Sequence, residues 1–349
     1  MSNSVIIIGG GVAGMEAASQ LSRSGMEVIL LERENSLGGH LQKWDRLFPN
    51  RRPGAEVLQY LESGMNDGIS VHLDAKVQTI EKENERFRVK LENHEEFISD
   101  ALLISTGYEV FDARKKEEYG YGIYDNVITS AELEEFFRKN RSENFLAGIK
   151  TKRVGLVHCV GSRDEKVGNL YCSKLCCITG VKQAIEIKEL LPGMEIFSFY
   201  MDLRMFDRHF EEMYYEAQQK YGIHFIRGRL SEASENQDHS ILVKVEDTLT
   251  GLPLKMTVDL LILLVGFVPS AETNRLAAML GLAPSEDGFL SPVDEHFRCN
   301  HTSMDGVFIS GAVKGPVGIE KTISDARAAA IQITQYLKEK VAGHAGKEN

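Results

Sequence analysis

Residues 5–14 read VIIIGGGVAG, and this stretch decides the fold. Its apolar start predicts a buried strand, and the helical pattern Ala13–Ser24 follows the glycines at once. In such a unit Gly9 permits a tight turn, Gly11 lets a pyrophosphate approach the backbone, and Gly14 allows close helix packing. The helix N-terminus supplies N–H groups and partial positive charge for phosphates. The stretch therefore predicts a dinucleotide site, the alternative being a glycine turn that holds no ligand.

An acidic residue stands at the position that such a site requires. Glu32 ends the next expected strand, Glu27–Glu32, roughly 20 residues after the glycines. A carboxylate at this position binds the ribose hydroxyls of an adenosine half. The glycine pattern alone is weak evidence, but strand, helix and acid in register make it strong.

Apolar strands alternate with helical patterns along the chain, which predicts an α/β fold with mostly parallel sheets. The other expected strands are Val71–Leu73, Ala75–Ile80, Phe87–Leu91, Ala101–Ser105, Val154–His158, Ile196–Tyr200, His224–Gly228, Ile241–Glu246 and Leu260–Val265. The other expected helices are Ala131–Asn140, Val181–Leu190, Arg208–Tyr221 and Ala326–Val341. A length of 349 residues suggests two domains.

Charge and hydropathy narrow the class of protein. The net charge of −11 argues against nucleic acid or an anionic membrane as the main partner. The longest apolar run, residues 260–268, is too short to span a bilayer. No signal peptide precedes the first strand, so we expect a cytoplasmic protein without a membrane span.

Four of the five cysteines are clustered: Cys159, Cys172, Cys176 and Cys177. In a cytoplasmic chain this clustering indicates metal or redox chemistry rather than structural disulfides. Four thiolates can ligate a 4Fe–4S cluster or a tetrahedral zinc ion. Buried thiols, a disulfide and chance clustering are the remaining alternatives. The isolated Cys299 fits an inert buried thiol better than a fifth ligand.

Three further motifs resemble those of the flavoproteins with two dinucleotide-binding domains. Gly38-Gly39 follows Glu32 at a similar spacing, and Ser105-Thr106-Gly107 is similar to their Ala-Thr-Gly element. Residues 306–312, GVFISGA, resemble their second flavin motif. That motif usually ends in Gly-Asp, whose aspartate binds the ribityl chain, and Ala312 stands in its place here.

The resemblance implies FAD and a thioredoxin-reductase-like fold of two Rossmann-like domains, the first discontinuous. Residues 1–112 and 267–349 are expected to form the FAD-binding domain, and residues 113–266 the second domain. The last helix is expected to point its N-terminus at the flavin N1 and O2 edge. The implied FAD contacts are Gly9, Gly11, Val12, Ala13, Gly14, Glu32, Arg33, Gly39, His40, Gln42, Val77, Thr106, Gly107, Gly311, Ala312, Gly318 and Ile319.

The second domain departs from these flavoproteins where they bind NAD(P)H, because Cys159 occupies the turn that usually carries a glycine fingerprint. Residues 159–164, CVGSRD, and 171–177, YCSKLCC, closely resemble the flavin-bearing A subunit of heterodisulfide reductase. So do residues 200–204, YMDLR, and 225–229, FIRGR. In that family the four cysteines hold a 4Fe–4S cluster close to FAD. Lys182 matches a family lysine near the flavin N5, where a cation favours reduced flavin.

This sequence lacks the extra cluster-binding parts of the longer family members, so we expect one FAD and one cluster. It most resembles the A subunit of the heterodisulfide-reductase-like complex of sulfur oxidisers. The resemblance implies iron–sulfur B and C subunits and a lipoate-carrying protein as partners, and a homodimer. The alternatives are the flavoprotein of a quinone-interacting complex, a stand-alone NAD(P)H-dependent disulfide reductase, and a scaffold that keeps FAD only for stability.

Overall fold

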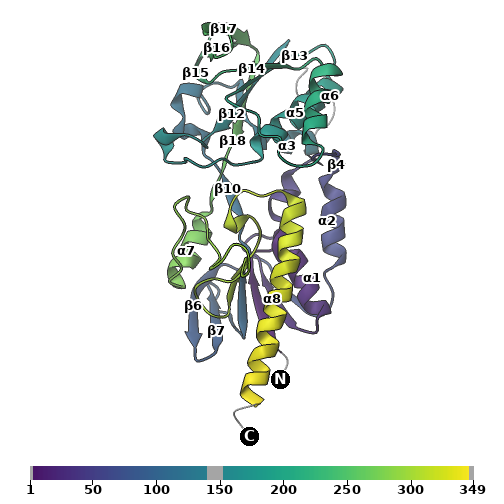
Figure 1. Cartoon of the computed structure of the whole chain (residues 1–349), viewed down its shortest axis with the longest axis vertical. Coiled ribbons are helices and arrows are strands. Elements are labelled where there is room, and N and C mark those ends of the chain that lie inside the picture. The colour runs from purple at the N-terminus through teal and green to yellow at the C-terminus, as the bar shows by residue number, and fades with distance from the viewer. Residues whose placement is uncertain (1–2, 140–151, 346–349) are drawn as a thin grey trace. The chain divides into compact units, whose positions relative to one another are not determined.

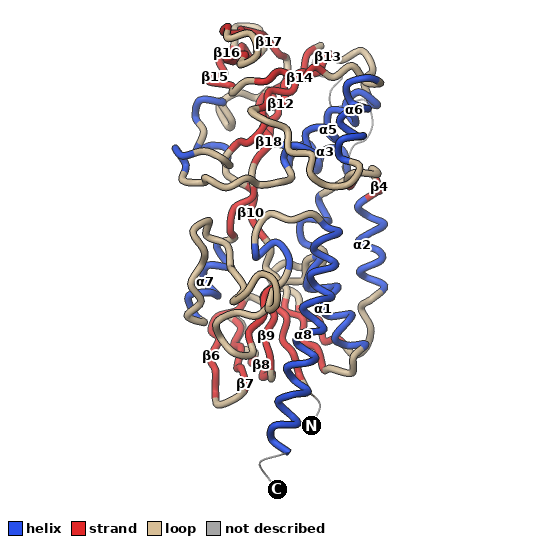
Figure 2. The backbone as a smooth tube through the Cα atoms, viewed as in Figure 1, coloured by secondary structure: helices blue, strands red, loops and turns tan. Residues whose placement is uncertain are grey.

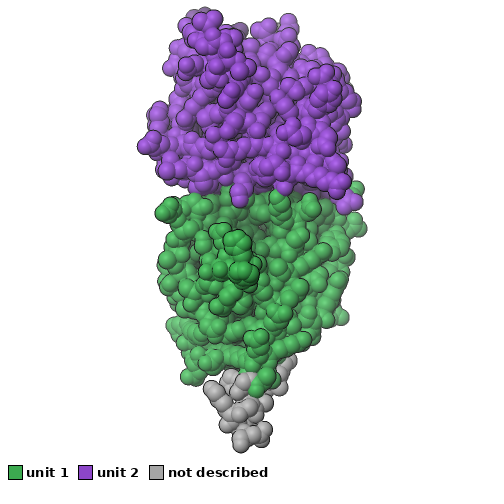
Figure 3. Space-filling model, viewed as in Figure 1, with its two compact units in different colours: residues 1–42, 55–109, 268–349 green, residues 43–54, 110–267 purple. Residues whose placement is uncertain are grey.

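The computed structural model describes residues 3–139 and 152–345 and divides into two compact units. The first unit comprises the chain up to Gln42, Ala55–Glu109 and the part from Val268 onward. The second comprises Lys43–Gly54 and Val110–Phe267 (Figure 3). The sequence-based division kept residues 43–54 with the first unit, whereas their contacts group them with the second.

A parallel sheet of five strands forms the centre of the first unit (Figure 1). The backbone pairing gives its strand order as β20-β9-β1-β2-β5. The strands are β1 (Ser4–Ile8), β2 (Glu27–Leu31), β5 (Ile69–His72), β9 (Ala101–Ile104) and β20 (Val307–Ile309). All of β1 is buried, as its run of branched apolar residues predicts for a central parallel strand. Because β1 pairs with β2 on one side and β9 on the other, the chain order reverses at β1.

Different layers cover the two faces of this sheet. On one face, Val5 and Ile7 pack with helices α1 (Val12–Arg23) and α8 (Ile319–Ala345). Small residues on both helices, including Ala17 and Ala329, are buried in the same cluster and permit close packing. The other face packs against a three-stranded antiparallel sheet and α7. These elements are β6 (Val77–Glu83), β7 (Arg86–Leu91), β8 (Glu96–Ser99) and α7 (Ala271–Met279). A further helix of this region, α2 (Gly54–Ser63), precedes β5 in the chain.

The second unit also contains a parallel sheet (Figure 2). Its strand order is β11-β18-β12-β13-β14. The strands are β11 (Val127–Thr129), β12 (Arg153–Val160), β13 (Glu195–Tyr200), β14 (His224–Arg227) and β18 (Leu260–Val265). Helices α3 (Ser130–Lys139), α5 (Cys176–Leu190) and α6 (Phe210–Gln219) share one hydrophobic cluster with this sheet. An antiparallel sheet of β15 (Leu230–Glu235), β16 (Ile241–Asp247) and β17 (Leu252–Val258) completes the unit, with the hairpin β3 (Arg46–Leu47) and β4 (Arg52–Pro53). The chain crosses between units at both ends of the segment Lys43–Gly54, and again in β10 (Tyr108–Val110) and in β19 (Phe267–Pro269).

The predicted fold class, two Rossmann-like domains with parallel sheets, is confirmed. The helix predicted at Val181–Leu190 was placed too late, because α5 begins at Cys176. The predicted helix Ala131–Asn140 matches α3 apart from Asn140, which lies outside the described residues. Helices α2 and α7 were missed.

No helix in the described parts of the chain combines the length and the apolar character needed to cross a bilayer.

Candidate functional site

Each parallel sheet has one point where the strand order reverses, and the candidate residues lie at these points. In the first unit the glycine-rich turn follows β1, between β2 and β9. In the second unit Cys159 lies at the end of β12, between β13 and β18. Ligands of open α/β sheets bind at such switch points, beyond the carboxyl ends of the strands.

The glycine turn fits a dinucleotide phosphate. Gly9 has φ of +107°, and an added Cβ would lie 2.6 Å from the Ser105 carbonyl oxygen. A Cβ on Gly14 would lie 1.9 Å from the Gly9 carbonyl oxygen, so the helix packs here only with glycine. A Cβ on Gly11 would meet nothing within 4 Å. Gly11 thus leaves open space at the start of α1, where Val12 and Ala13 form the first turn and no side chain caps the helix.

The carboxylate of Glu32 is buried against this turn. Its Oε2 atom accepts a hydrogen bond from the Gly10 N–H at 2.6 Å, and Oε1 accepts one from the Glu34 N–H at 2.9 Å. Each carboxylate oxygen has capacity for a second donor. Glu32 therefore can bind ribose hydroxyls while it stays anchored to the backbone.

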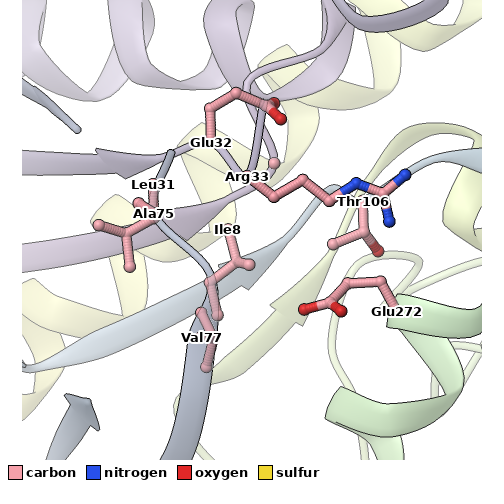
Figure 4. Close-up of a pocket in the computed structure, with 9 residues that line it drawn as sticks. Ile8, Leu31, Glu32, Arg33, Ala75, Val77, Thr106 and Glu272 are labelled. Atoms are coloured by element: carbon pink, nitrogen blue, oxygen red, sulfur yellow. The ribbon is translucent and has the colours of Figure 1, made fainter. Parts of the chain in front are cut away.

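A pocket that is open to solvent lies beside Glu32 (Figure 4). The predicted residues that line it are Gly9, Glu32, Arg33, Val77 and Thr106. Ile8, Leu31, Ala75 and Glu272 also line it and were missed. Apolar side chains gather on one side of the opening, and Arg33, Thr106 and Glu272 on the other. Such a surface suits an adenosine, with a flat apolar base and a polar sugar.

The second flavin motif lies against the first. Gly311 has φ of +78°, and an added Cβ would lie 2.8 Å from the Cβ of Ala13. Gly311 and Ala312 begin a 3₁₀ turn, Gly311–Lys314, and α8 begins at Ile319 soon afterwards. The Gly318 carbonyl accepts hydrogen bonds from both the N–H and the hydroxyl of Thr322, each 2.9 Å long. Residues from the two ends of the chain thus meet at one switch point.

Among the remaining predicted FAD contacts, the glycines border open space or the glycine turn, whereas the polar side chains already contact other protein groups. Gly39 lies next to the turn, since an added Cβ would be 3.4 Å from the Gly11 Cα. Gly107 has φ of +71° and open space around it. The His40 ring stacks on Tyr108 at 4.4 Å, and Gln42 donates a hydrogen bond to the Leu37 carbonyl. His40 and Gln42 therefore already have protein partners.

Three of the four clustered cysteines meet in the second unit. Cys159 is the second-last residue of β12, and Cys176 and Cys177 open α5, whose N-terminus has no side-chain cap. All three are buried. A hydrogen bond from the Cys176 thiol lowers the pKa of Cys159. Hydrogen bonds to Cys177 from the Cys176 thiol and from the nearby imidazole of His158 lower the pKa of Cys177 to about 4. The same hydrogen bonds and burial raise the pKa of Cys176.

The fourth cysteine, Cys172, lies apart from this group. It is half-exposed, and its sulfur accepts a hydrogen bond from the Lys174 N–H at 3.3 Å. Within residues 3–139 and 152–345, no three or more His, Cys, Asp or Glu side chains are arranged to hold a metal ion. Three converging thiols match the donor type of an iron–sulfur centre, but the fourth predicted ligand does not join them here.

The backbone around these thiols is unusual. Cys159, Arg163 and Lys174 all have left-handed φ angles, between +54° and +60°. Residues other than glycine adopt this region at a cost of about 1–3 kcal/mol each, and such residues gather at functional sites. The buried Asp164 fixes the same loop through ion pairs with Lys116 at 2.6 Å and Arg229 at 2.9 Å.

Lys182 is buried in the second unit within a cluster of carboxylates. Its ammonium group pairs with Glu134 and, at 3.6 Å, with Glu186, and it donates a hydrogen bond to the Arg46 carbonyl at 2.8 Å. Burial acts to lower the pKa of Lys182, but the two glutamates raise it above its ordinary value. The two glutamates therefore favour the charged form of Lys182, and its predicted role at the flavin N5 stays a prediction.

Cys299 belongs to the first unit, where its sulfur lies 3.3 Å from both the Asn300 Oδ1 and the Gln332 Nε2 atoms. It therefore has polar partners of its own and is not among the clustered cysteines.

Comparison with known proteins identifies a family. Residues 1–131 and 178–332 match the sequence profile of the family described as pyridine nucleotide-disulphide oxidoreductase. The part left out, residues 132–177, contains all four clustered cysteines.

Curated relatives are A subunits of heterodisulfide reductases. The chain is 31% identical over 411 residues to the A subunit of the H(2):CoB-CoM heterodisulfide,ferredoxin reductase of Methanothermobacter marburgensis, covering 93% of this chain and 62% of the relative. It is also 31% identical to the iron-sulfur A subunit of the CoB–CoM heterodisulfide reductase of Methanocaldococcus jannaschii, covering 95% of this chain and 64% of the relative. The chain thus spans less than two thirds of the length of these relatives.

Solved structures share the fold. Thioredoxin reductase of Lactococcus lactis superposes with a TM-score of 0.66 at 22% identity, covering 97% of this chain and 100% of that one. Thioredoxin reductase of T. acidophilum gives a TM-score of 0.65 at 18% identity, covering 96% and 99%. The solved structures share the fold, and the profile match shows that the chain belongs to the pyridine nucleotide-disulphide oxidoreductase family.

Proposed function

We propose that this chain is an electron-transfer component of a heterodisulfide-reductase-like complex, with one FAD and one 4Fe–4S cluster, acting in cytoplasmic sulfur oxidation. One observation carries the proposal: the two sheets present different ligand-binding chemistry at equivalent switch points. The first offers an open glycine turn, and the second offers converging thiols. The similarity to A subunits supports the same assignment.

In the first unit, the residues around the glycine turn bind and orient the FAD. Gly11 and the N-terminal N–H groups of α1 receive the pyrophosphate, and Glu32 receives the adenosine ribose. Gly311 and Ala312 adjoin Ala13 and therefore receive the flavin half. When bound, FAD supplies the ability to exchange electrons in pairs with one partner and singly with another.

In the second unit, Cys159, Cys176 and Cys177 are the proposed cluster ligands, with Cys172 as the fourth. Arg163, whose side chain interacts with Cys159, favours the thiolate of that residue, and Cys176 and Cys177 lie in the first turn of α5. A bound 4Fe–4S cluster supplies single-electron transfer at a potential set by its surroundings.

The proposed partners are iron–sulfur B and C subunits of the same complex and a lipoate-carrying protein, with the chain as a homodimer. The relatives' names describe them as subunits, which supports assembly of this chain with partner subunits.

The test is an analysis of the full chain purified without oxygen and supplied with iron, sulfide and FAD. The proposal predicts one FAD and about four irons per chain. Cys159→Ser and Cys172→Ser are expected to lose most of the iron but keep FAD. Cys299→Ser is the matched control and keeps both. A wild-type chain that takes up FAD but no iron contradicts the cluster assignment.

A stand-alone NAD(P)H-dependent disulfide reductase is the second candidate, favoured by the family match. Against it, residues 159–164 at the end of β12 read CVGSRD and lack the glycine pattern that a nicotinamide dinucleotide requires. Rapid bleaching of the bound flavin by NADH or NADPH supports this candidate, and no bleaching over minutes excludes it.

A further inference from the structure

An aspartate on α8 gathers four hydrogen-bond donors around the second flavin turn. The Oδ2 atom of Asp325 accepts hydrogen bonds from the Gly311 N–H at 2.7 Å and from the Ser310 hydroxyl at 3.0 Å. Its Oδ1 atom accepts them from Asn300 Nδ2 at 3.0 Å and from Lys314 Nζ at 2.5 Å. One carboxylate therefore holds both ends of the turn Gly311–Lys314.

The turn that Asp325 holds is tightly placed. Gly311 has a left-handed φ, and its Cα lies so close to the start of α1 that an added Cβ would be 2.8 Å from the Cβ of Ala13. Ser310 is fully buried, and its hydroxyl bonds to Asp325. A shift of Gly311 by a fraction of an ångström therefore alters its distance from the glycine-rich turn.

The charge of Asp325 is balanced locally. Lys314 pairs with it directly, and both side chains are about four-fifths buried. Lys314 also donates to the Cys299 carbonyl at 2.9 Å, which fixes the ammonium group from a second side. Because the pair is neutral, the carboxylate can lie beside the turn without repelling a pyrophosphate.

We propose that Asp325 is a positioning residue for FAD, which holds Gly311 and Ala312 in the conformation that the flavin half requires. Ala312 leaves this turn without a carboxylate of its own, and Asp325 supplies one from α8. The inference rests on the proposed binding of FAD to the first unit. Hydrogen bonds to a charged group are the strong ones, so their loss has a measurable effect on affinity.

The experiment measures two dissociation constants for the full chain. That of FAD is measured by flavin fluorescence, and that of ADP by its competition with FAD. In Asp325→Asn the amide NH₂ faces donors, and the charge that pairs with Lys314 is lost. We expect the FAD dissociation constant to rise about tenfold or more. ADP binds only the adenosine half, so its constant is expected to stay within about twofold.

Glu320→Gln is the matched control, since Glu320 is an exposed carboxylate on the same helix. We expect its FAD affinity to equal that of the wild type. If Asp325→Asn does not fold, Ser310→Ala removes only one of the four bonds, and it is expected to weaken FAD binding about threefold.

Three outcomes separate the claims. The inference is overturned if Asp325→Asn binds FAD as tightly as the wild type does. If only Ser310→Ala folds, unchanged FAD affinity in that variant overturns it. An equal loss of FAD and ADP affinity also overturns it, because the carboxylate then supports the whole pocket rather than the second turn. A wild-type chain that binds no FAD overturns the proposed function itself.

Discussion

Gly11 and Gly14 lie in one turn, but an added methyl group meets different surroundings at each. Gly11 faces open space and has an ordinary negative φ of −78°, so the chain alone accepts alanine there. We predict that Gly11→Ala keeps or slightly raises stability, by about 0.5 kcal/mol, but weakens FAD binding at least about tenfold. Chemical denaturation of the FAD-free chain and an FAD titration measure the two effects.

Gly14→Ala is the companion variant, because its Cβ would lie 1.9 Å from the Gly9 carbonyl oxygen. It is expected to lose about 1–3 kcal/mol of stability before any cofactor is added. Wild-type FAD affinity in Gly11→Ala contradicts the assignment of this turn to the pyrophosphate.

Lys182 carries the largest predicted stability effect of a single residue. Lys182→Met leaves Glu134 and Glu186 buried without their cation, and we expect the free energy of unfolding to fall by about 3–5 kcal/mol. Lys152→Met, at an exposed lysine of the same unit, is expected to change it by less than about 0.5 kcal/mol. Urea denaturation of both variants tests this, and equal stabilities contradict the ionic cluster.

The pH dependence of this effect follows from the raised pKa of Lys182. A cation whose folded pKa lies above the unfolded value, near 10.5, contributes its full stability below that value. The contribution is lost only as the pH rises through the folded pKa. The difference between wild type and Lys182→Met is therefore expected to be constant from about pH 7 to 9 and to shrink in stronger alkali.

The sequence predicted the role of a residue where its partners are close to it in the chain, and failed where they are distant. The tight turn at Gly9 and the close packing at Gly14 depend on neighbouring residues, so the motif alone predicted both. The burial of Lys182 could not be predicted, because its partner Glu134 lies 48 residues away in the chain. Glu272 in the pocket was missed for the same reason, since it comes from α7 and belongs to no motif.

At the scale of elements, α5 and the loop before it decide which cysteines meet. The sequence predicted a helix from Val181, because the residues before it, CCITG, are poor helix formers. The helix in fact starts at Cys176, where tertiary packing in the core of the second unit outweighs propensity. This start places Cys176 and Cys177 in the first turn, while Cys172 stays outside.

This arrangement predicts how the thiols of the metal-free chain react. Cys159, Cys176 and Cys177 are buried, whereas Cys172 and Cys299 are half-exposed. Alkylation of the native chain with iodoacetamide, followed by mass spectrometry of peptides, is expected to label Cys172 and Cys299 first. In urea all five are expected to react at similar rates. Preferential labelling of Cys159 or Cys176 in the native chain contradicts the observed packing.

At the scale of the whole molecule, the alternation of strand and helix patterns predicted an α/β fold, and the family resemblance implied two Rossmann-like units. Neither predicted that residues 43–54 group with the second unit. That grouping depends on long-range pairs, such as Arg51 with Glu189 and Glu216, which no local pattern reveals. The four clustered cysteines, which lie outside the family match, mark where this chain departs from its family.

The central claim is that one chain holds both a two-electron and a one-electron centre. The most direct measurement is an oxygen-free reductive titration of the reconstituted full chain, followed by absorbance and by electron paramagnetic resonance. The account predicts uptake of about three electrons per chain, two by the flavin and one by a cluster that becomes paramagnetic. Uptake of about two electrons with no cluster signal contradicts it.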